Sequence, residues 1–170
     1  MTEKTFKSNK LKHKLIKACV SDLDEIKFFE KQVLNDSSEY TSARNLKRII
    51  KSADSEVLLV KDGKNKICAY AIVTLRHYKN VPSGHVYKIA VTQEYRRRGL
   101  ATELIKKLEE FVINNSIFKI YAEARESNKA SLGLFKKQGY KEVKQLFAHY
   151  SCLNNSYELE NAVQLCKLLL

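Results

Sequence analysis

Three arginines run into a glycine in the segment EYRRRGLAT, residues 94–102, and this segment gives the clearest chemical signal in the sequence. A β-rich run ends just before it, and an amphipathic helical pattern begins within it. Backbone N–H groups at the start of a helix have no acceptor inside the helix, and with the helix dipole they form an anion site. Gly99 removes a side chain that would block a phosphate, and the arginines add charge-assisted hydrogen bonds. The segment therefore predicts a diphosphate site.

The same segment resembles a family signature. It lacks the glycine spacing of a Rossmann turn and the Gly-Lys-Ser/Thr of a P-loop. It is similar to the [QR]-x-x-G-x-[GA] motif of the GNAT superfamily of acetyl-CoA-dependent N-acetyltransferases, with Arg96, Gly99 and Ala101 at the defined positions.

A second block strengthens this resemblance. Residues 126–143, ESNKASLGLFKKQGYKEV, resemble the downstream motif N-x-A-A-x-x-L-Y-x-x-x-G-F of the same family. The residues in register are Asn128, Ala130, Leu134, Gly139 and Tyr140. The resemblance covers about residues 15–168. Within the family, residues 120–131 are similar to the L-E-V-R-x-S-N segment of the ribosomal-protein-alanine N-acetyltransferase branch.

The resemblance implies that acetyl-CoA is the cosubstrate and binds where two neighbouring strands splay apart. Main-chain groups of residues 89–91 would pair with the pantetheine arm like an added strand, and Asn128 would hydrogen-bond the arm. Ile89 and Val91 would equally serve as sheet core, and the two roles are compatible. The implied cofactor-binding residues are Ile89, Ala90, Val91, Arg96, Arg97, Arg98, Gly99, Leu100, Ala101, Thr102, Asn128 and Phe135.

Acetyl transfer to an amine needs a proton acceptor, because an alkyl ammonium titrates near ~10 and an α-amino group near ~8. By resemblance, Glu123 aligns with the glutamate that acts as the base in this branch. It falls in a strand that we expect to be buried on both faces, where an unpaired carboxylate is costly. The alternative is that Glu123 pairs with a basic residue and has a structural role only.

The leaving thiolate of coenzyme A also needs a proton. The family usually supplies this proton from a tyrosine, and the aligned residue here is Phe135, which has no hydroxyl. Three explanations stay open: the thiolate leaves without an acid, a nearby tyrosine substitutes, or the domain binds acetyl-CoA without efficient transfer. The substitute is expected to be Tyr150, then Tyr140, then Tyr121. Glu123 and Tyr150 are therefore the expected catalytic residues.

The elements needed to hold these residues follow from periodicity. Strands are expected at 14–20, on both sides of Asp62-Gly63, and at 85–91, 118–125, 140–150 and 160–170, with a break at Pro82-Ser83-Gly84. Helices are expected at 21–34, opened by a capping box of Ser21 and Asp24, and at 41–54, 99–115 and 128–138. This order predicts an α/β, single-domain, GNAT-like fold: a mixed, mostly antiparallel sheet covered by helices on both faces.

The length of 170 residues fits one domain, and we expect a basic leader at 1–12 followed by an N-acetyltransferase domain at 13–170. No apolar run resembles a secretory signal or a membrane span, so a cytoplasmic location without membrane contact is expected. The cysteines are far apart and match no zinc spacing, so no metal is predicted.

The formal net charge of +12 attracts polyanions without saying which. The lysines are spread along the chain, which favours a solvated basic surface over dedicated nucleic-acid binding, although that question stays open. The leading interpretation is acetyl transfer from acetyl-CoA to a primary amine by direct attack in a ternary complex. The favoured acceptor is a protein N-terminus or lysine, including that of a ribosomal protein. The alternatives are a small-molecule amine acetyltransferase, or a catalytically weak module that binds acetyl-CoA or the ribosome.

Overall fold

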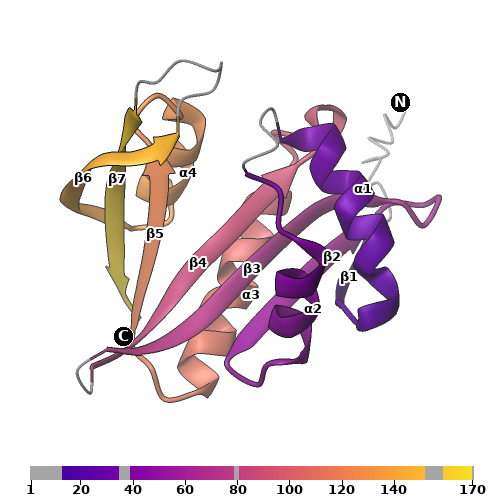
Figure 1. Ribbon diagram of the computed structural model, residues 1–170, viewed down its shortest axis with the longest axis horizontal. Helices are drawn as coiled ribbons and strands as arrows, with labels where there is room; N and C mark the ends of the chain where they lie inside the picture. Colours follow the sequence, from indigo (N-terminus) through magenta and orange to yellow (C-terminus); the bar gives the residue numbers. More distant parts are fainter. Residues whose placement is uncertain (1–12, 35–38, 79–80, 152–158, 170) are drawn as a thin grey trace, which may run out of the picture.

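The computed structural model describes residues 13–34, 39–78, 81–151 and 159–169. Seven strands form one sheet in the order β1-β2-β3-β4-β5-β7-β6 (Figure 1). The strands are β1 (Lys14–Lys17), β2 (Ser55–Lys61), β3 (Ile67–Tyr78), β4 (Val81–Val91), β5 (Lys119–Arg125), β6 (Lys141–Ser151) and β7 (Leu159–Leu168). The α-helices are α1 (Leu23–Val33), α2 (Ala43–Lys51), α3 (Leu100–Asn114) and α4 (Lys129–Lys137), and 3-10 turns lie at Val20–Asp22 and Gln93–Tyr95.

The predicted element order and fold class are confirmed. Five of the six strand pairings are antiparallel, and only β4 and β5 pair in parallel. Each of the four expected helical ranges contains the observed helix and is longer than it by a few residues. The predicted leader, residues 1–12, lies outside the described residues.

Helices cover both faces of the sheet over its first four strands. On one face α1 and α2 bury Phe29 and Leu46 against Leu59, Tyr70 and Ile72 of β2 and β3. On the other face the apolar side of α3 packs over the same strands and over β5, where it contributes a long row of leucine, isoleucine and valine side chains. Figure 1 shows α1 and α2 in front of the sheet and α3 behind it.

The other part of the sheet is covered on one face only. Within the described residues, no helix lies over β5, β7 and β6 on the side of α1 and α2, while α4 lies on the far side (Figure 1). We call this uncovered side the open face. The expectation that β5 is buried on both faces is therefore wrong: Ala122 and Ala124 point into the core, but Glu123 lies on the open face with 29% of its side chain exposed.

The sheet divides between β4 and β5. Their parallel pairing lasts for three residue pairs, from Gly84 with Ile120 to Val86 with Ala122, and then the two strands separate (Figure 1). On its other edge β4 continues to pair with β3, with a register shift that makes Tyr87 a bulge residue. The separation begins beside this bulge, which is consistent with the extra twist and bending that bulges impose. A cleft between two strands of one sheet follows.

Two local predictions are wrong. Residues 82–84 do not break the chain but form the start of β4, where Pro82 tolerates its missing N–H near a strand end. Glycine is required at position 84 because an added Cβ would lie 2.6 Å from Val112 Cγ2 of α3. The capping box consists of Cys19 and Asp22 rather than Ser21 and Asp24, since a 3-10 turn precedes α1.

Candidate active site

The cleft between β4 and β5 has two halves that meet in the middle. The Gly99 half is lined by the start of α3, the end of β4 and the first turns of α4. The Glu123 half is lined by β5, the middle of β4 and residues of β6. The residues shared by both halves are Leu34, Glu39, Ile89, Arg125, Asn128 and Ser131. Most of the predicted site residues therefore lie along one continuous cleft.

In the Gly99 half, α3 begins without a side-chain cap. Gly99 is the N-cap residue, with φ of 85°, a left-handed conformation that favours glycine. The Glu103 N–H donates to the Gly99 carbonyl at 3.0 Å and closes the first turn of the helix, so the N–H groups of the preceding residues have no acceptor within the helix. A Cβ built on Gly99 meets no heavy atom within 4 Å. An anion can thus approach these N–H groups closely.

The three arginines before Gly99 have different surroundings. Arg96 and Arg97 line the Gly99 half, and Arg96 Nε also donates to the Val91 carbonyl at 3.1 Å. Arg98 does not line it; its guanidinium lies 5.0 Å from the centroid of the Tyr95 ring. Leu100, Ala101 and Thr102 complete the turn.

Two lysines that the sequence interpretation did not select also line the Gly99 half. Lys129 and Lys137 lie at opposite ends of α4, one in its first turn and one at its end. Together with Arg96 and Arg97 they give this half four cations besides Arg125 at the junction, and no carboxylate apart from Glu39 at the junction. Nothing in the sequence of a nine-residue helix indicates which neighbour Lys137 faces.

The end of β4 provides a free sheet edge. Ile89, Ala90 and Val91 line the Gly99 half, and within the described residues no strand pairs with this edge of β4 beyond Val86. Asn128 is the N-cap of α4, where its Oδ1 accepts the Ser131 N–H at 3.0 Å and leaves the side-chain NH₂ as a donor. A free strand edge, an uncapped helix start and four cations fit a long ligand that carries amides and phosphates.

Glu123 is the carboxylate at the centre of the other half. Gln164 Nε2 donates to its Oε1 at 2.8 Å, and His149 Nε2 lies 3.2 Å from its Oε2. The His149 side chain is 38% exposed and lies at a distortion of β6. There Ala148 has φ of 50°, and the Ala148 N–H donates to Asn161 Oδ1. The sequence interpretation missed His149 because this distortion breaks the alternation that assigns a strand residue to a face. The only available signal was its place beside Tyr150.

Tyr150 lies in the same half, with its ring against those of its neighbours. The Arg125 guanidinium is 4.6 Å from its ring centroid, and the His149 ring is edge-on at 4.9 Å. Burial, reinforced by the nearby charge of Glu123, raises the pKa of Tyr150 to about 12. Its phenol therefore holds a proton at neutral pH.

The other aromatic candidates lie in different places. Phe135 is buried and lines the Glu123 half rather than the Gly99 half, packing edge-on to Tyr140 at 5.1 Å. Tyr140 lines neither half; it is 2% exposed, and burial raises the pKa of its hydroxyl. Tyr121 lines the Glu123 half and stacks on His85 with centroids 5.2 Å apart. Tyr150 and Tyr121 are thus within the cleft.

The junction of the two halves is bridged by an ion pair. Arg125 Nε donates to Glu39 Oε1 at 2.8 Å, which joins the end of β5 to the segment before α2, and Arg125 Nη1 donates to Glu160 at 3.1 Å. The sequence interpretation did not select Glu39, whose role depends on a contact 86 residues away along the chain.

A buried network holds the Glu39 segment in place. Glu30, with 0% exposure, accepts hydrogen bonds from the Thr41 N–H and hydroxyl and from the Tyr70 hydroxyl, all between 2.6 and 2.8 Å. Lys88 Nζ donates to Glu30 at 3.2 Å and to the Glu39 carbonyl. A buried carboxylate with four partners is fully satisfied, so this wall of the cleft is preformed.

His85 provides a pH-dependent test of this half of the cleft. Burial, assisted by the charge of Arg76, lowers the pKa of His85 to about 4 from 6.5. Between these values the unfolded chain binds the proton and the folded chain does not, so stability falls as the pH falls. The free energy of unfolding should drop by roughly 1 to 3 kcal/mol from pH 6.5 to pH 4 through this residue.

Urea denaturation of the wild type and of His85→Gln at several pH values measures this effect. The difference in unfolding free energy between the two proteins should change with pH only below 6.5. Curves that stay parallel down to pH 4 would show that His85 is protonated equally in both states.

In the described part of the chain, no helix is both long and apolar enough to cross a membrane. Over the same residues, no group of three or more His, Cys, Asp or Glu side chains is arranged to hold a metal ion. Cys19, Cys68 and Cys166 are free thiols.

Comparison with known proteins places the chain in a family. An N-alpha-acetyltransferase of Saccharolobus solfataricus is 38% identical over 84 residues, which are 46% of this chain and 50% of the relative, so the match spans about half of each. An N-alpha-acetyltransferase of Sulfolobus acidocaldarius is 25% identical over 158 residues, which are 87% of this chain and 91% of the relative.

The fold is similar to that of a solved acetyltransferase structure. The ribosomal-protein-S18-alanine N-acetyltransferase of Escherichia coli superposes with a TM-score of 0.77 at 17% identity, covering 93% of this chain and 94% of the other. The model of the Acetyltransferase (GNAT) family matches residues 16–140, a range that contains Gly99, Glu123 and Asn128. The chain therefore belongs to the GNAT acetyltransferase family.

Proposed function

We propose that this protein transfers the acetyl group of acetyl-CoA to the α-amino group of a polypeptide. The observation that carries the proposal is the divided cleft, in which a basic, uncapped helix start and a carboxylate–imidazole pair lie on either side of one junction. Family membership and the N-alpha-acetyltransferases among the relatives support it. The expected cytoplasmic location remains a prediction.

In this proposal the Gly99 half holds acetyl-CoA, which supplies an activated thioester. The N–H groups of residues 100–102 and the side chains of Arg96 and Arg97 hold the diphosphate, and Lys129 and Lys137 add to the attraction. The free edge of β4 at residues 89–91 pairs with the amide-bearing arm, and the Asn128 NH₂ group donates to it. Arg98, which stacks on Tyr95, contributes long-range charge rather than contact.

The Glu123 half removes a proton from the acceptor. An ammonium group has no lone pair, so one proton must move from its nitrogen before attack. We assign that proton to the Glu123–His149 pair, which acts as one unit: the Glu123 carboxylate orients His149 Nε2–H and stabilises the imidazolium after the second ring nitrogen, Nδ1, takes up the proton. Histidine is the side chain that most often acts as a general base, which favours the pair over an isolated glutamate.

Tyr150 is assigned as the proton donor in place of the hydroxyl missing at Phe135. Its phenol holds a proton at neutral pH, and its elevated pKa makes it a weak acid. We therefore expect Tyr150→Phe to lower kcat by a modest factor, about 10- to 100-fold, with little change in the KM for acetyl-CoA. Tyr140→Phe, a matched change outside the cleft, should leave kcat within about twofold. Equal rates in both variants would show that the thiolate leaves without help from Tyr150.

Release of the coenzyme thiol measures the proposed activity directly. Purified protein and acetyl-CoA should release thiol with peptides that have a free N-terminus, and not with the same peptides blocked at that amine. If thiol is released only with small amines such as polyamines, the acceptor is a small molecule rather than a polypeptide. No release with any amine, while coenzyme A still raises the melting temperature, would support a binding module instead.

A further inference from the structure

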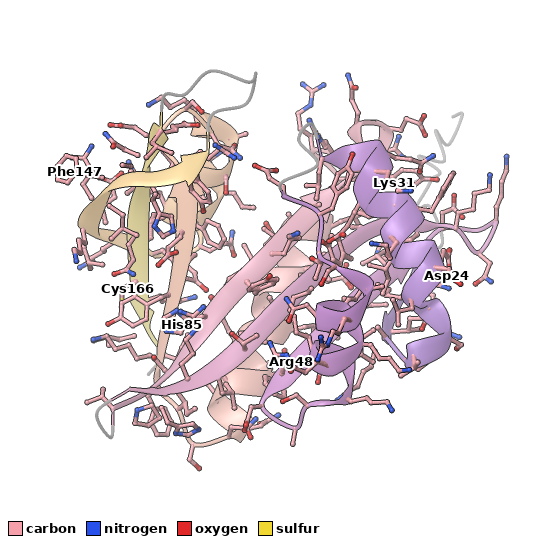
Figure 2. The ribbon with its side chains drawn as sticks, in the orientation of Figure 1. Asp24, Lys31, Arg48, His85, Phe147 and Cys166 are labelled. Carbon is pink, nitrogen blue, oxygen red and sulfur yellow. The ribbon has the colours of Figure 1, made fainter. Side chains whose placement is uncertain are left out.

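Four cations on and beside the open face have no carboxylate partner. Arg76 at the end of β3 and Lys141 and Lys144 of β6 are exposed, and Lys119 of β5 is half-buried. Within the described residues none of the four forms an ion pair, although Lys119 Nζ lies 5.1 Å from the Tyr121 ring centroid. We call Arg76, Lys119, Lys141 and Lys144 the basic face. Figure 2 shows its surroundings, with His85 and Cys166 labelled.

Strand register places these cations relative to Glu123. Glu123 pairs with Gln164, and Gln164 pairs with Lys144, so Lys144 lies in the same row, two strands from Glu123. Lys141 lies in the adjacent row, since it pairs with Cys166, which pairs with Tyr121. Neighbouring strands are about 4.8 Å apart and alternate residues on a strand about 6.6 Å apart. Both lysines are therefore within reach of a chain that starts at Glu123.

Arg76 and Lys119 extend the basic face away from the junction. Arg76 lines the same half of the cleft as Glu123 and His85. Arg76 of β3 pairs with Ser83 of β4, and the following residue, Gly84, pairs with Ile120 of β5. Arg76 and Lys119 therefore lie in the row next to the Gly84–Ile120 pair. Glu123, the carboxylate nearest to these cations by strand register, is already engaged by His149 and Gln164.

We propose that the basic face binds acidic side chains that follow the reacting amine, so that the acceptors of this protein are polypeptides with Asp or Glu near the N-terminus. This rests on the proposed acetyl transfer at Glu123. An extended chain rises about 3.3 Å per residue, the same step as the strands beneath it. The register places these lysines about 10 to 13 Å from Glu123, which is three to four residues of an extended chain, so acidic side chains at roughly the second to fifth positions of an acceptor can reach them.

A polypeptide suits this surface better than single-stranded RNA. Non-specific binding of single strands combines cations with aromatic rings on which bases stack. Tyr121, the aromatic residue between Lys119 and Lys141, is stacked against His85, so that face of its ring is already covered. The basic face also begins at the carboxylate to which an ammonium is attracted, and a nucleic acid has no positive end to place there.

Matched peptides and matched variants test the proposal. The peptides share a free N-terminal residue and carry either Asp and Glu or Asn and Gln at the next four positions. The test variant is Arg76→Gln/Lys141→Gln/Lys144→Gln. The control variant is Lys14→Gln/Lys66→Gln/Lys106→Gln, which loses the same charge at exposed positions elsewhere. The readout is kcat/KM for each peptide at about 0.05 M and about 0.5 M salt.

Wild type and control variant should prefer the acidic peptide at low salt and lose most of that preference at high salt. An exposed ion pair contributes about 1.5- to 5-fold, so the test variant should lose about tenfold in the ratio of acidic to neutral kcat/KM. A second readout, anisotropy of the acidic peptide with an acetylated N-terminus, should show weaker binding to the test variant only.

Three outcomes would overturn the inference. The first is equal kcat/KM for both peptides in the wild type, which leaves acetyl transfer intact. The second is the same loss of acidic preference in the control variant, which would trace the effect to net charge. The third is RNA that binds the wild type more tightly than the acidic peptide and loses binding only in the test variant. Absence of turnover with every peptide contradicts the proposed function instead.

Discussion

Replacing Glu123 by glutamine should reduce kcat/KM for a peptide amine by about 10²- to 10⁴-fold at neutral pH. Glutamine keeps the shape of the side chain and can still accept the hydrogen bond from Gln164, so the fold is preserved. It cannot stabilise a charged His149, which lies 3.2 Å away. Steady-state thiol release with one peptide across a pH series measures the loss. Activity of the variant should recover above pH ~8, where the α-amino group loses its proton without help.

Glu126→Gln is the control for this prediction. Glu126 follows β5, lines neither half of the cleft, and bonds Gln145 and Asn161. The same loss of one carboxylate there should change kcat/KM by less than about threefold. His149→Gln should resemble Glu123→Gln, and the double variant should be hardly worse than either single one, because the two groups act as a unit. Full additivity, or an unaffected Glu123→Gln enzyme, would remove the pair from the mechanism.

Gly99→Ala should weaken coenzyme A binding by about 10- to 100-fold. The left-handed φ of 85° strains any residue with a Cβ, at a cost of about 1 to 2 kcal/mol. Apart from its chain neighbours, the new methyl group meets no protein atom within 4 Å, so it occupies open space at a residue that lines the cleft together with the first turn of α3. That space is where the proposed diphosphate approaches the backbone N–H groups. Titration calorimetry with coenzyme A measures the change.

Gly139→Ala separates strain from blockage. Gly139 follows α4 with φ of 89°, and a Cβ there would meet only Lys167 Cε, at 3.8 Å. Both variants should lose similar stability in thermal denaturation, and only Gly99→Ala should lose affinity for coenzyme A. If the two variants bind coenzyme A equally well, the turn before α3 does not hold the diphosphate.

The glycine after α4 also illustrates what the sequence could predict. Local patterns with one physical solution were read correctly, and the helix end is an example: the Tyr140 N–H bonds the Phe135 carbonyl, the Gly139 N–H bonds that of Lys136, and the rings of Phe135 and Tyr140 pack together. The order of strands and helices followed from periodicity for the same reason.

Features that depend on distant contacts could not be predicted. Glu39 meets Arg125 only because β5 turns toward the segment before α2, and His149 reaches Glu123 only because β6 is distorted at Ala148. The prediction that Glu123 is buried is wrong because no described helix covers the open face. The periodicity of a strand does not indicate how many helices pack on each face of its sheet. The sequence predicts a break at Pro82 and Gly84, because nothing local indicates that Val112 of α3 will pack against Gly84.

The Glu39–Arg125 bridge has a consequence for the kinetic scheme. The two halves of the cleft have separate linings and share only the residues around this ion pair. Under the proposed reaction, each substrate can bind in its own half of the cleft, and each product can leave that half before or after the other. Initial-rate patterns should therefore fit random rather than ordered addition, and the spent coenzyme should compete with acetyl-CoA while leaving the peptide site accessible.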